Sequence, residues 1–160
     1  MVVGSTFAKL RNQTETGNAW GDWDVDAYTV EDAAFGFIRM ENGATIILES
    51  SWALNIADPC EAKTTICGTK GGADMLDGLR FNRAMYGHLA MTKVDTKSGG
   101  AAFYEGKSEN ASDKSMRLWL KCIEEDTEPV VKPEEALVVS QILEGIYTSA
   151  KTGEPVYFNK

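Results

Sequence analysis

Residues 30–55 read VEDAAFGFIRMENGATIILESSWALN. Two runs rich in β-branched and aromatic residues flank the dipeptide Asn42-Gly43. Asn and Gly tolerate the positive φ that both positions of a two-residue hairpin loop require. The sequence therefore predicts a β-hairpin with Asn42 and Gly43 as its loop, in which Arg39 would lie opposite Ile46.

The two faces of this hairpin differ in composition. One face would carry Phe37, Leu48 and Trp52, and we expect it to lie in the core. The other would carry Ile38 and Ile47 among polar residues, which is more apolar than the outer face of a half-buried antiparallel sheet. Both faces are therefore predicted to be covered.

Further strands and two helices are expected along the chain. Apolar residues at helical spacing predict a helix around Met116–Ile123, with Ser112 or Asp113 as its N-cap. A longer helix is predicted from Pro133 to the capping Gly153. The remaining strands are expected over residues 2–10, 60–67, 73–76, 79–83, 88–94 and 156–158. This order predicts an α+β fold in one domain of 160 residues: a mostly antiparallel, open-faced β-sheet with two C-terminal helices packed on one face.

Composition limits the function classes. Apolar residues make up 43% and charged residues 25%, as in soluble globular proteins. A net charge of −8 argues against nucleic-acid binding, which needs basic patches. Without a membrane-length apolar run or a signal peptide, the chain is expected to avoid membranes and to be cytoplasmic. Cys60, Cys67 and Cys122 are expected to be reduced, mostly buried thiols.

The candidate motifs for metal binding, phosphate binding and catalysis are incomplete. Asp22, Asp24 and Asp26 lack the Gly and Glu of a calcium-binding loop, so no metal site is predicted. The run Gly68–Gly72 does not fit a phosphate-binding loop and is predicted to be a tight turn. His88 is the only histidine and is expected to be structural or exposed. No Gly-x-Gly-x-x-Gly fingerprint is present, so this chain is expected to bind no cofactor itself and to hold no catalytic residue.

Four segments in order resemble one family. They are residues 31–52, residues 68–72, the run Pro129–Ala136, and YTSAKTGEPV at 147–156. Together they are similar to the C-terminal domain of the glucose–fructose oxidoreductase/inositol dehydrogenase/MocA family. Members of that family also carry an N-terminal Rossmann domain that binds NAD or NADP, and a catalytic lysine in a Glu-Lys-Pro motif. Neither the Gly-rich fingerprint of a Rossmann domain nor a Glu-Lys-Pro motif occurs here. The resemblance therefore implies the substrate-binding and oligomerisation part of an NAD(P)-dependent sugar or polyol oxidoreductase, which is expected to be inactive on its own.

The resemblance also points to substrate-binding residues. The connection after the Trp52 strand, carrying Asn55 and Asp58, resembles the segment that lines the substrate side of the family's cleft. The acidic loop with Trp20 and Asp22 is expected to approach it. The other interpretation is that Asn55 and Asp58 only form a turn before a proline.

Other functions remain open at this point. A stand-alone α+β interaction module is the main alternative, and a small acidic hydrolase would need a nucleophile–base pair that the sequence does not show. The hairpin face with Ile38, Met40 and Ile47 would be a large exposed apolar patch if both helices covered the opposite face. We therefore expect a homo-oligomer that associates through the sheet.

Overall fold

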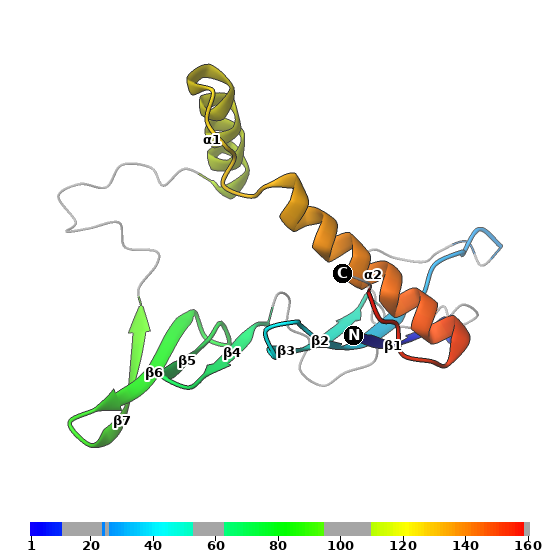
Figure 1. Cartoon of the computed structure of the whole chain (residues 1–160), viewed down its shortest axis with the longest axis horizontal. Coiled ribbons are helices and arrows are strands. Elements are labelled where there is room, and N and C mark those ends of the chain that lie inside the picture. The colour runs from blue at the N-terminus through cyan, green and yellow to red at the C-terminus, as the bar shows by residue number, and fades with distance from the viewer. Residues whose placement is uncertain (11–23, 25, 53–62, 95–109, 159–160) are drawn as a thin grey trace. The chain divides into compact units, whose positions relative to one another are not determined.

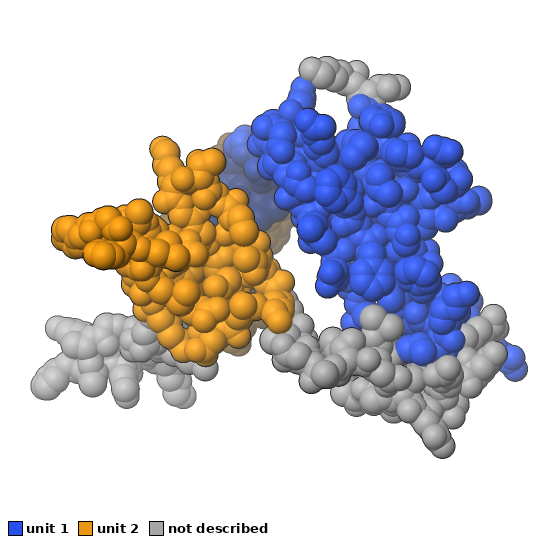
Figure 2. All heavy atoms as spheres, turned by 90° about the horizontal axis from the view of Figure 1, so that it is seen from below, with its two compact units in different colours: residues 1–57, 128–160 blue, residues 58–127 orange. Residues whose placement is uncertain are grey.

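The computed structural model describes residues 1–10, 24, 26–52, 63–94 and 110–158. It divides into two compact units, coloured separately in Figure 2. Unit 1 comprises Met1–Ala57 and Glu128–Lys160, and unit 2 comprises Asp58–Thr127. Each unit contains one antiparallel sheet and one helix, which confirms the α+β class.

Unit 1 is a three-stranded sheet with one long helix against it. Strands β1 (Val2–Phe7), β2 (Ala33–Arg39) and β3 (Thr45–Ser51) are antiparallel and lie in that order. Helix α2 (Pro133–Thr152) packs on β1 and β2 (Figure 1). A single helix therefore covers the sheet within this unit.

Unit 2 holds the second sheet and the other helix. Its strands are β4 (Thr65–Gly68), β5 (Gly71–Asp74), β6 (Leu79–Met85) and β7 (His88–Val94), again in sequence order and antiparallel. Helix α1 spans Ala111–Glu125. The tight turn predicted at Gly68–Gly72 is confirmed as the connection from β4 to β5.

The central hairpin forms, but its register differs from the prediction by one residue. Arg39 lies opposite Thr45, because the loop has three residues rather than two. Met40 N donates to Ala44 O at 2.8 Å, and Gly43, with φ 87°, takes the left-handed position that three-residue loops require. Asn-Gly serves in both loop types, so the dipeptide located the turn without fixing its length.

The predicted assignment of the two faces is wrong for strand β2, whereas Leu48 of β3, also expected in the core, does pack against it. Ile38 lies on the face under α2, where it forms the core with Val2 and Ile146; each is no more than 2% exposed. Phe37, expected in the core, lies on the opposite face and is 44% exposed. Ile47, opposite Phe37, is 74% exposed. Both faces are apolar in sequence, so composition did not decide which one the helix would cover.

Small residues explain why α2 packs where it does. Gly4 and Gly36 lie opposite each other under the helix, and a Cβ on Gly4 would come within 2.7 Å of Ile146 Cα. Gly4 N donates to the buried Ser149 Oγ at 3.0 Å, and a Cβ on Gly145 would meet Val2 Cβ at 3.2 Å. Glycines on both surfaces let the helix backbone approach the sheet closely.

The helix ends match the sequence prediction in part. Helix α2 begins at Pro133 and is capped by Gly153 at φ 76°, as predicted. The N-cap of α1 is Asn110, whose side chain accepts from Asp113 N at 2.8 Å, rather than Ser112 or Asp113. Neither described helix has the length and apolar character needed to cross a membrane.

The outer strands are shorter than predicted. The first strand ends at Phe7, and the predicted strand over residues 156–158 is reduced to a bridge between Val156 and Val2. Cys67 is exposed and Cys122 is half-buried, so the expectation of buried thiols is wrong for Cys67. Cys60 lies outside the described residues.

Candidate functional site

The four predicted substrate-binding residues lie outside the described part of the chain. Trp20 and Asp22 belong to residues 11–23, and Asn55 and Asp58 belong to residues 53–62. The structure does describe the residues from which both segments depart.

Both segments leave the same end of the unit 1 sheet. Phe7 lies opposite Ala33, and Ala33 lies opposite Ser51, so β1 ends, β2 begins and β3 ends side by side. From there the chain continues through Leu10 toward residue 11 and through Trp52 toward residue 53. The sheet therefore starts both candidate segments from neighbouring positions.

Asp32 fixes the first departure point. Its side chain is 1% exposed, and Oδ2 accepts hydrogen bonds from Lys9 N at 2.5 Å and Leu10 N at 2.7 Å. Its own N–H donates to Phe7 O at 2.8 Å. A carboxylate that accepts two backbone amides satisfies donors that the strand no longer pairs beyond Phe7.

Asp32 and the residue before it, Glu31, fix the second departure point, where the chain leaves β3. Asp32 O accepts from Ser51 Oγ at 2.9 Å and from Trp52 N at 3.3 Å. Glu31 O accepts from the Trp52 indole Nε1 at 2.7 Å. Glu31 and Asp32 thus contact the ends of both β1 and β3.

Trp52 is an edge residue rather than the core residue predicted from sequence. It is 40% exposed, and its ring centroid lies 5.6 Å from that of the buried Tyr28. The prediction assumed that the face carrying Leu48 stays buried as far as Trp52, but Trp52 follows Ser51, the last residue of β3. The observed position gives the indole a hydrogen bond to Glu31 O, as half-buried tryptophans commonly need.

Two tyrosines surround the acidic pair. Tyr147, from α2, donates its hydroxyl to Glu31 Oε1 at 2.5 Å. That hydrogen bond, with burial and the charge of Glu31 adding to it, raises the pKa of Tyr147. Burial, followed by the charges of Asp32 and Glu31, raises the pKa of Tyr28. Both phenols therefore stay neutral at physiological pH, and the Tyr147 hydroxyl serves as a hydrogen-bond donor to Glu31.

The hydrogen bonds of Asp32 organise the backbone at the ends of two strands. The Asp32 oxygen that accepts both amides is buried, and sequence reasoning did not single Asp32 out as functional. The only signal was its position directly before a buried strand, within a segment that carried the family resemblance. His88, at the start of β7, is exposed, as predicted.

Unit 2 contains an open groove on its sheet. The groove has a volume of about 490 Å³. Its walls combine glycine backbone with two cations and one aromatic ring, provided by Ile66, Lys70, Gly71, Gly72, Ala73, Phe81, Asn82, Arg83 and Thr92. Asn82 Oδ1 accepts from Gly72 N at 2.8 Å, so the side-chain oxygen of Asn82 already links two strands of the sheet.

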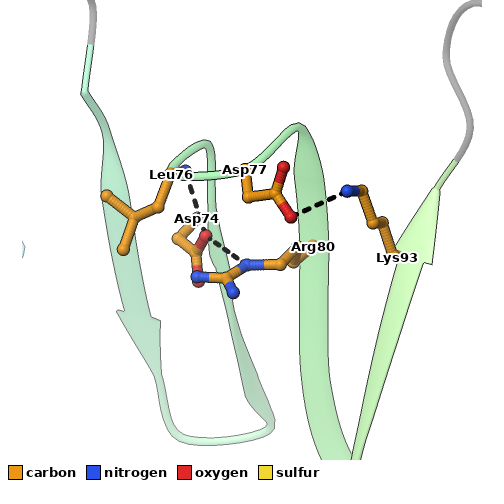
Figure 3. A network of polar contacts seen from close by, with 5 residues as sticks. All are labelled: Asp74, Leu76, Asp77, Arg80 and Lys93. Carbon is orange, nitrogen blue, oxygen red and sulfur yellow. Dashed lines mark hydrogen bonds and ion pairs between the residues drawn. The ribbon is translucent and has the colours of Figure 1, made fainter. Parts of the chain in front are cut away.

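A polar network orders the turn between β5 and β6 (Figure 3). Asp74 Oδ1 accepts from Arg80 Nε at 2.8 Å and from Leu76 N at 3.1 Å, and Asp77 pairs with Lys93 at 2.8 Å. The hydrogen bond from Arg80 lowers the pKa of Asp74, and the one from Lys93 lowers the pKa of Asp77. The side chains of Lys93 and Asp77 are more than half exposed, so their pair shapes the turn and stabilises the fold little, whereas Arg80 and Asp74 are only 25% and 19% exposed.

The described acidic residues do not form a metal site. No group of three or more candidate ligands occurs among the residues that the structure places. Asp24, one of the three aspartates in the rejected calcium pattern, instead accepts from Asp26 N at 2.9 Å within its own turn.

A nicotinamide dinucleotide does not fit the described helix N-termini. Such cofactors place their pyrophosphate at a helix N-terminus with free amides and little negative charge. Helix α1 has Asp113 in its first turn, and the amide of Asp113 is already taken by Asn110. Helix α2 begins with Pro133, Glu134 and Glu135. Within the described residues, both helix starts therefore repel a phosphate.

One family model matches almost the whole chain. The C-terminal α/β domain of the GFO/IDH/MocA oxidoreductase family aligns with residues 2–158. A curated relative, D-glucoside 3-dehydrogenase of Escherichia coli (strain K12), is 29% identical over 159 residues. That alignment covers 97% of this chain and 41% of the relative.

Two solved structures share the fold. An aldose-aldose oxidoreductase from Caulobacter crescentus, complexed with glycerol, superposes with a TM-score of 0.64 at 18% identity, over 98% of this chain and 40% of that one. An oxidoreductase from Agrobacterium radiobacter, in complex with NAD+, L-tartaric acid and magnesium, gives 0.58 at 16% identity, over 96% and 41%. The chain thus spans about two fifths of the length of these relatives.

Proposed function

The chain belongs to the GFO/IDH/MocA oxidoreductase family, as its C-terminal α/β domain, and from this membership we propose that it is the substrate-binding and oligomerisation domain of an NAD(P)-dependent sugar or polyol oxidoreductase. The observation that carries the proposal is the 29% identity to D-glucoside 3-dehydrogenase across 97% of the chain. In the complete protein the bound nicotinamide would supply the hydride acceptor for oxidation of a carbinol of the substrate to a carbonyl, with the hydroxyl proton leaving to a base or to water.

The substrate class rests on the relatives and on the expected chemistry of the site. One relative is named for a D-glucoside and one structural neighbour for aldoses. Hydroxyl-rich ligands are recognised by a few polar side chains held on a rigid scaffold. Asn55, Asp58, Trp20 and Asp22 are proposed for that role, because both of their segments leave the same end of the unit 1 sheet.

The nicotinamide cofactor is assigned to the part of the complete protein that this chain lacks. The 160-residue chain should bind neither NADH nor NADPH, because its described helix starts carry negative charge where a pyrophosphate would bind. Titration calorimetry of the chain with both nucleotides checks this expectation. Binding of either one with a micromolar dissociation constant would contradict it.

The complete reading frame tests the oxidoreductase proposal directly. A protein carrying this domain should reduce NAD or NADP when supplied with an aldose or a glycoside, followed by absorbance of the reduced nicotinamide. If no sugar or polyol supports reduction of either nucleotide, the proposed function is wrong.

The open face of the unit 1 sheet supports self-association. This face, which we call the open face, lies opposite α2 and carries five apolar side chains that are 37% to 74% exposed: Val3, Phe7, Phe35, Phe37 and Ile47. An apolar cluster spread over three strands is large for a monomer. A second copy of the same face could cover it in a two-fold dimer.

Ile47→Lys is expected to weaken this association. The substitution places a charge on the most exposed apolar residue of the open face and leaves the core under α2 intact. Light scattering at about 100 µM, where a dimer with a micromolar dissociation constant is mostly assembled, should give a dimer or tetramer for the wild type and a smaller mass for the variant. A monomeric wild type would mean that another domain of the complete protein covers this face instead.

A further inference from the structure

We propose that Glu31 and Asp32 form one anchor that holds the ends of β1 and β3 in a fixed mutual geometry, making Asp32 a positioning residue for the substrate. We call this dipeptide the acidic anchor. The inference rests on the proposed function, because it concerns the two chain segments to which substrate binding is assigned. Asp32 itself touches backbone and is not a catalytic residue.

The first argument is that a single dipeptide contacts both strand ends. Asp32 reaches one end through its side chain, by accepting from Lys9 N and Leu10 N. It reaches the other through its backbone, by accepting from Ser51 Oγ and Trp52 N. A displacement of Asp32 would therefore move both ends together.

The second argument is burial. The Asp32 side chain is 1% exposed, whereas most of the chain's other carboxylates that the structure describes are exposed. A buried carboxylate is costly unless hydrogen bonds satisfy it, and the two amides at 2.5 Å and 2.7 Å do so. An arrangement of the chain that moved Lys9 and Leu10 away from this carboxylate would leave their amides without this partner, which costs free energy.

The third argument is that the anchor is tied to α2, the helix that packs on the sheet. Glu31 Oε1 accepts from Tyr147, which lies on α2 next to the core residue Ile146. Glu31 O also accepts from the Trp52 indole. The anchor thus connects both strand ends to the helix that packs on the sheet, which is how a scaffold keeps binding groups in place.

Asp32→Ala in the 160-residue chain tests the shared geometry. Amide hydrogen exchange at Lys9 and Leu10 should accelerate about tenfold or more, since each loses one hydrogen bond. The Trp52 indole N–H donates to the backbone oxygen of the neighbouring Glu31, and its exchange should accelerate as well. Amides inside α2, such as that of Ile146, should keep their protection.

Two further variants sharpen the result. Asp32→Asn retains a carbonyl oxygen that can accept from Lys9 and Leu10, and should restore much of the protection. Asp24→Ala removes a carboxylate that accepts only within its own turn, and should leave all three reporters unchanged. Acceleration confined to Lys9 and Leu10, with the Trp52 indole unaffected, would overturn the shared anchor.

Ser51→Ala keeps the proposal testable if Asp32→Ala does not fold. This exposed residue loses its hydrogen bond to Asp32 O at 2.9 Å. Faster exchange at both Trp52 and Lys9 supports the anchor. Faster exchange at Trp52 alone contradicts it.

Kinetics of the complete protein test the positioning role. Asp32→Ala there should raise the KM for the sugar about tenfold, because displaced binding groups weaken substrate alignment, and should leave the KM for the nicotinamide unchanged. An active variant with an unchanged sugar KM would overturn the inference. A complete protein with no activity toward sugars would overturn the proposed function and leave the exchange result standing.

Discussion

Ile38→Asp is expected to unfold unit 1. Ile38 is 2% exposed and packs with Val2 and Ile146 under α2. The substitution would bury an unpaired carboxylate and remove most of an apolar side chain, which together cost about 4 kcal/mol or more. That loss is a large part of the 5–15 kcal/mol that typically stabilises a domain. Urea unfolding followed by circular dichroism should show a midpoint far below that of the wild type.

Ile47→Asp is the matched control. It introduces the same charge on the next strand, at a side chain that is 74% exposed on the open face. Its unfolding midpoint, measured on dilute protein, should lie close to that of the wild type, because surface substitutions usually change stability by about 0.5 kcal/mol or less. Equal losses for the two variants would mean that α2 does not cover the face with Ile38.

Gly4→Ala is expected to destabilise unit 1 by about 3 kcal/mol, although it adds only one methyl group. The new Cβ would lie 2.7 Å from Ile146 Cα and 2.8 Å from Ile146 O. Backbone atoms of a helix cannot rotate away as a side chain can, so α2 must shift as a whole. That shift would also stretch the hydrogen bond from Gly4 N to Ser149 Oγ. Thermal and urea unfolding measure the loss.

Gly36→Ala separates this effect from the general effect of replacing glycine in a strand. Its new Cβ would also meet Ile146, but at Cδ1, the far end of a flexible side chain, at 2.7 Å. Rotation of Ile146 can relieve that contact, so the loss should be clearly smaller than for Gly4→Ala. A Gly4→Ala variant as stable as the wild type would contradict the close approach of α2 to β1.

Some residues of the candidate site were predicted from the sequence, and others were found only in the folded structure. Sequence resemblance selected the segments with Trp20, Asp22, Asn55 and Asp58, and their roles stay predictions. It gave no function to Asp32, because a single aspartate before a strand resembles many solvated turn residues. Its burial and its hydrogen bonds to Lys9, Leu10 and Ser51 depend on residues about twenty positions away in sequence. Only the folded chain brings these groups together.

Local sequence was sufficient for the elements whose signals are local. The ends of α2 were predicted from Pro133 and Gly153, because capping acts within a few positions, and strand β7 was predicted with the bounds that the structure gives it. The α+β class followed from the order of these elements. The family followed from an ordered set of short segments spread along the chain.

The tertiary structure decided the register and the buried face. The Asn42-Gly43 dipeptide fits loops of two or three residues, and the difference of one residue changes every cross-strand partner. Both faces of the hairpin carry large apolar residues, so hydrophobic patterning could not choose between Ile38 and Phe37 as the core residue. The choice came from close packing across distant parts of the chain, because only the face with Gly4 and Gly36 lets the α2 backbone come near enough to bury Ile146.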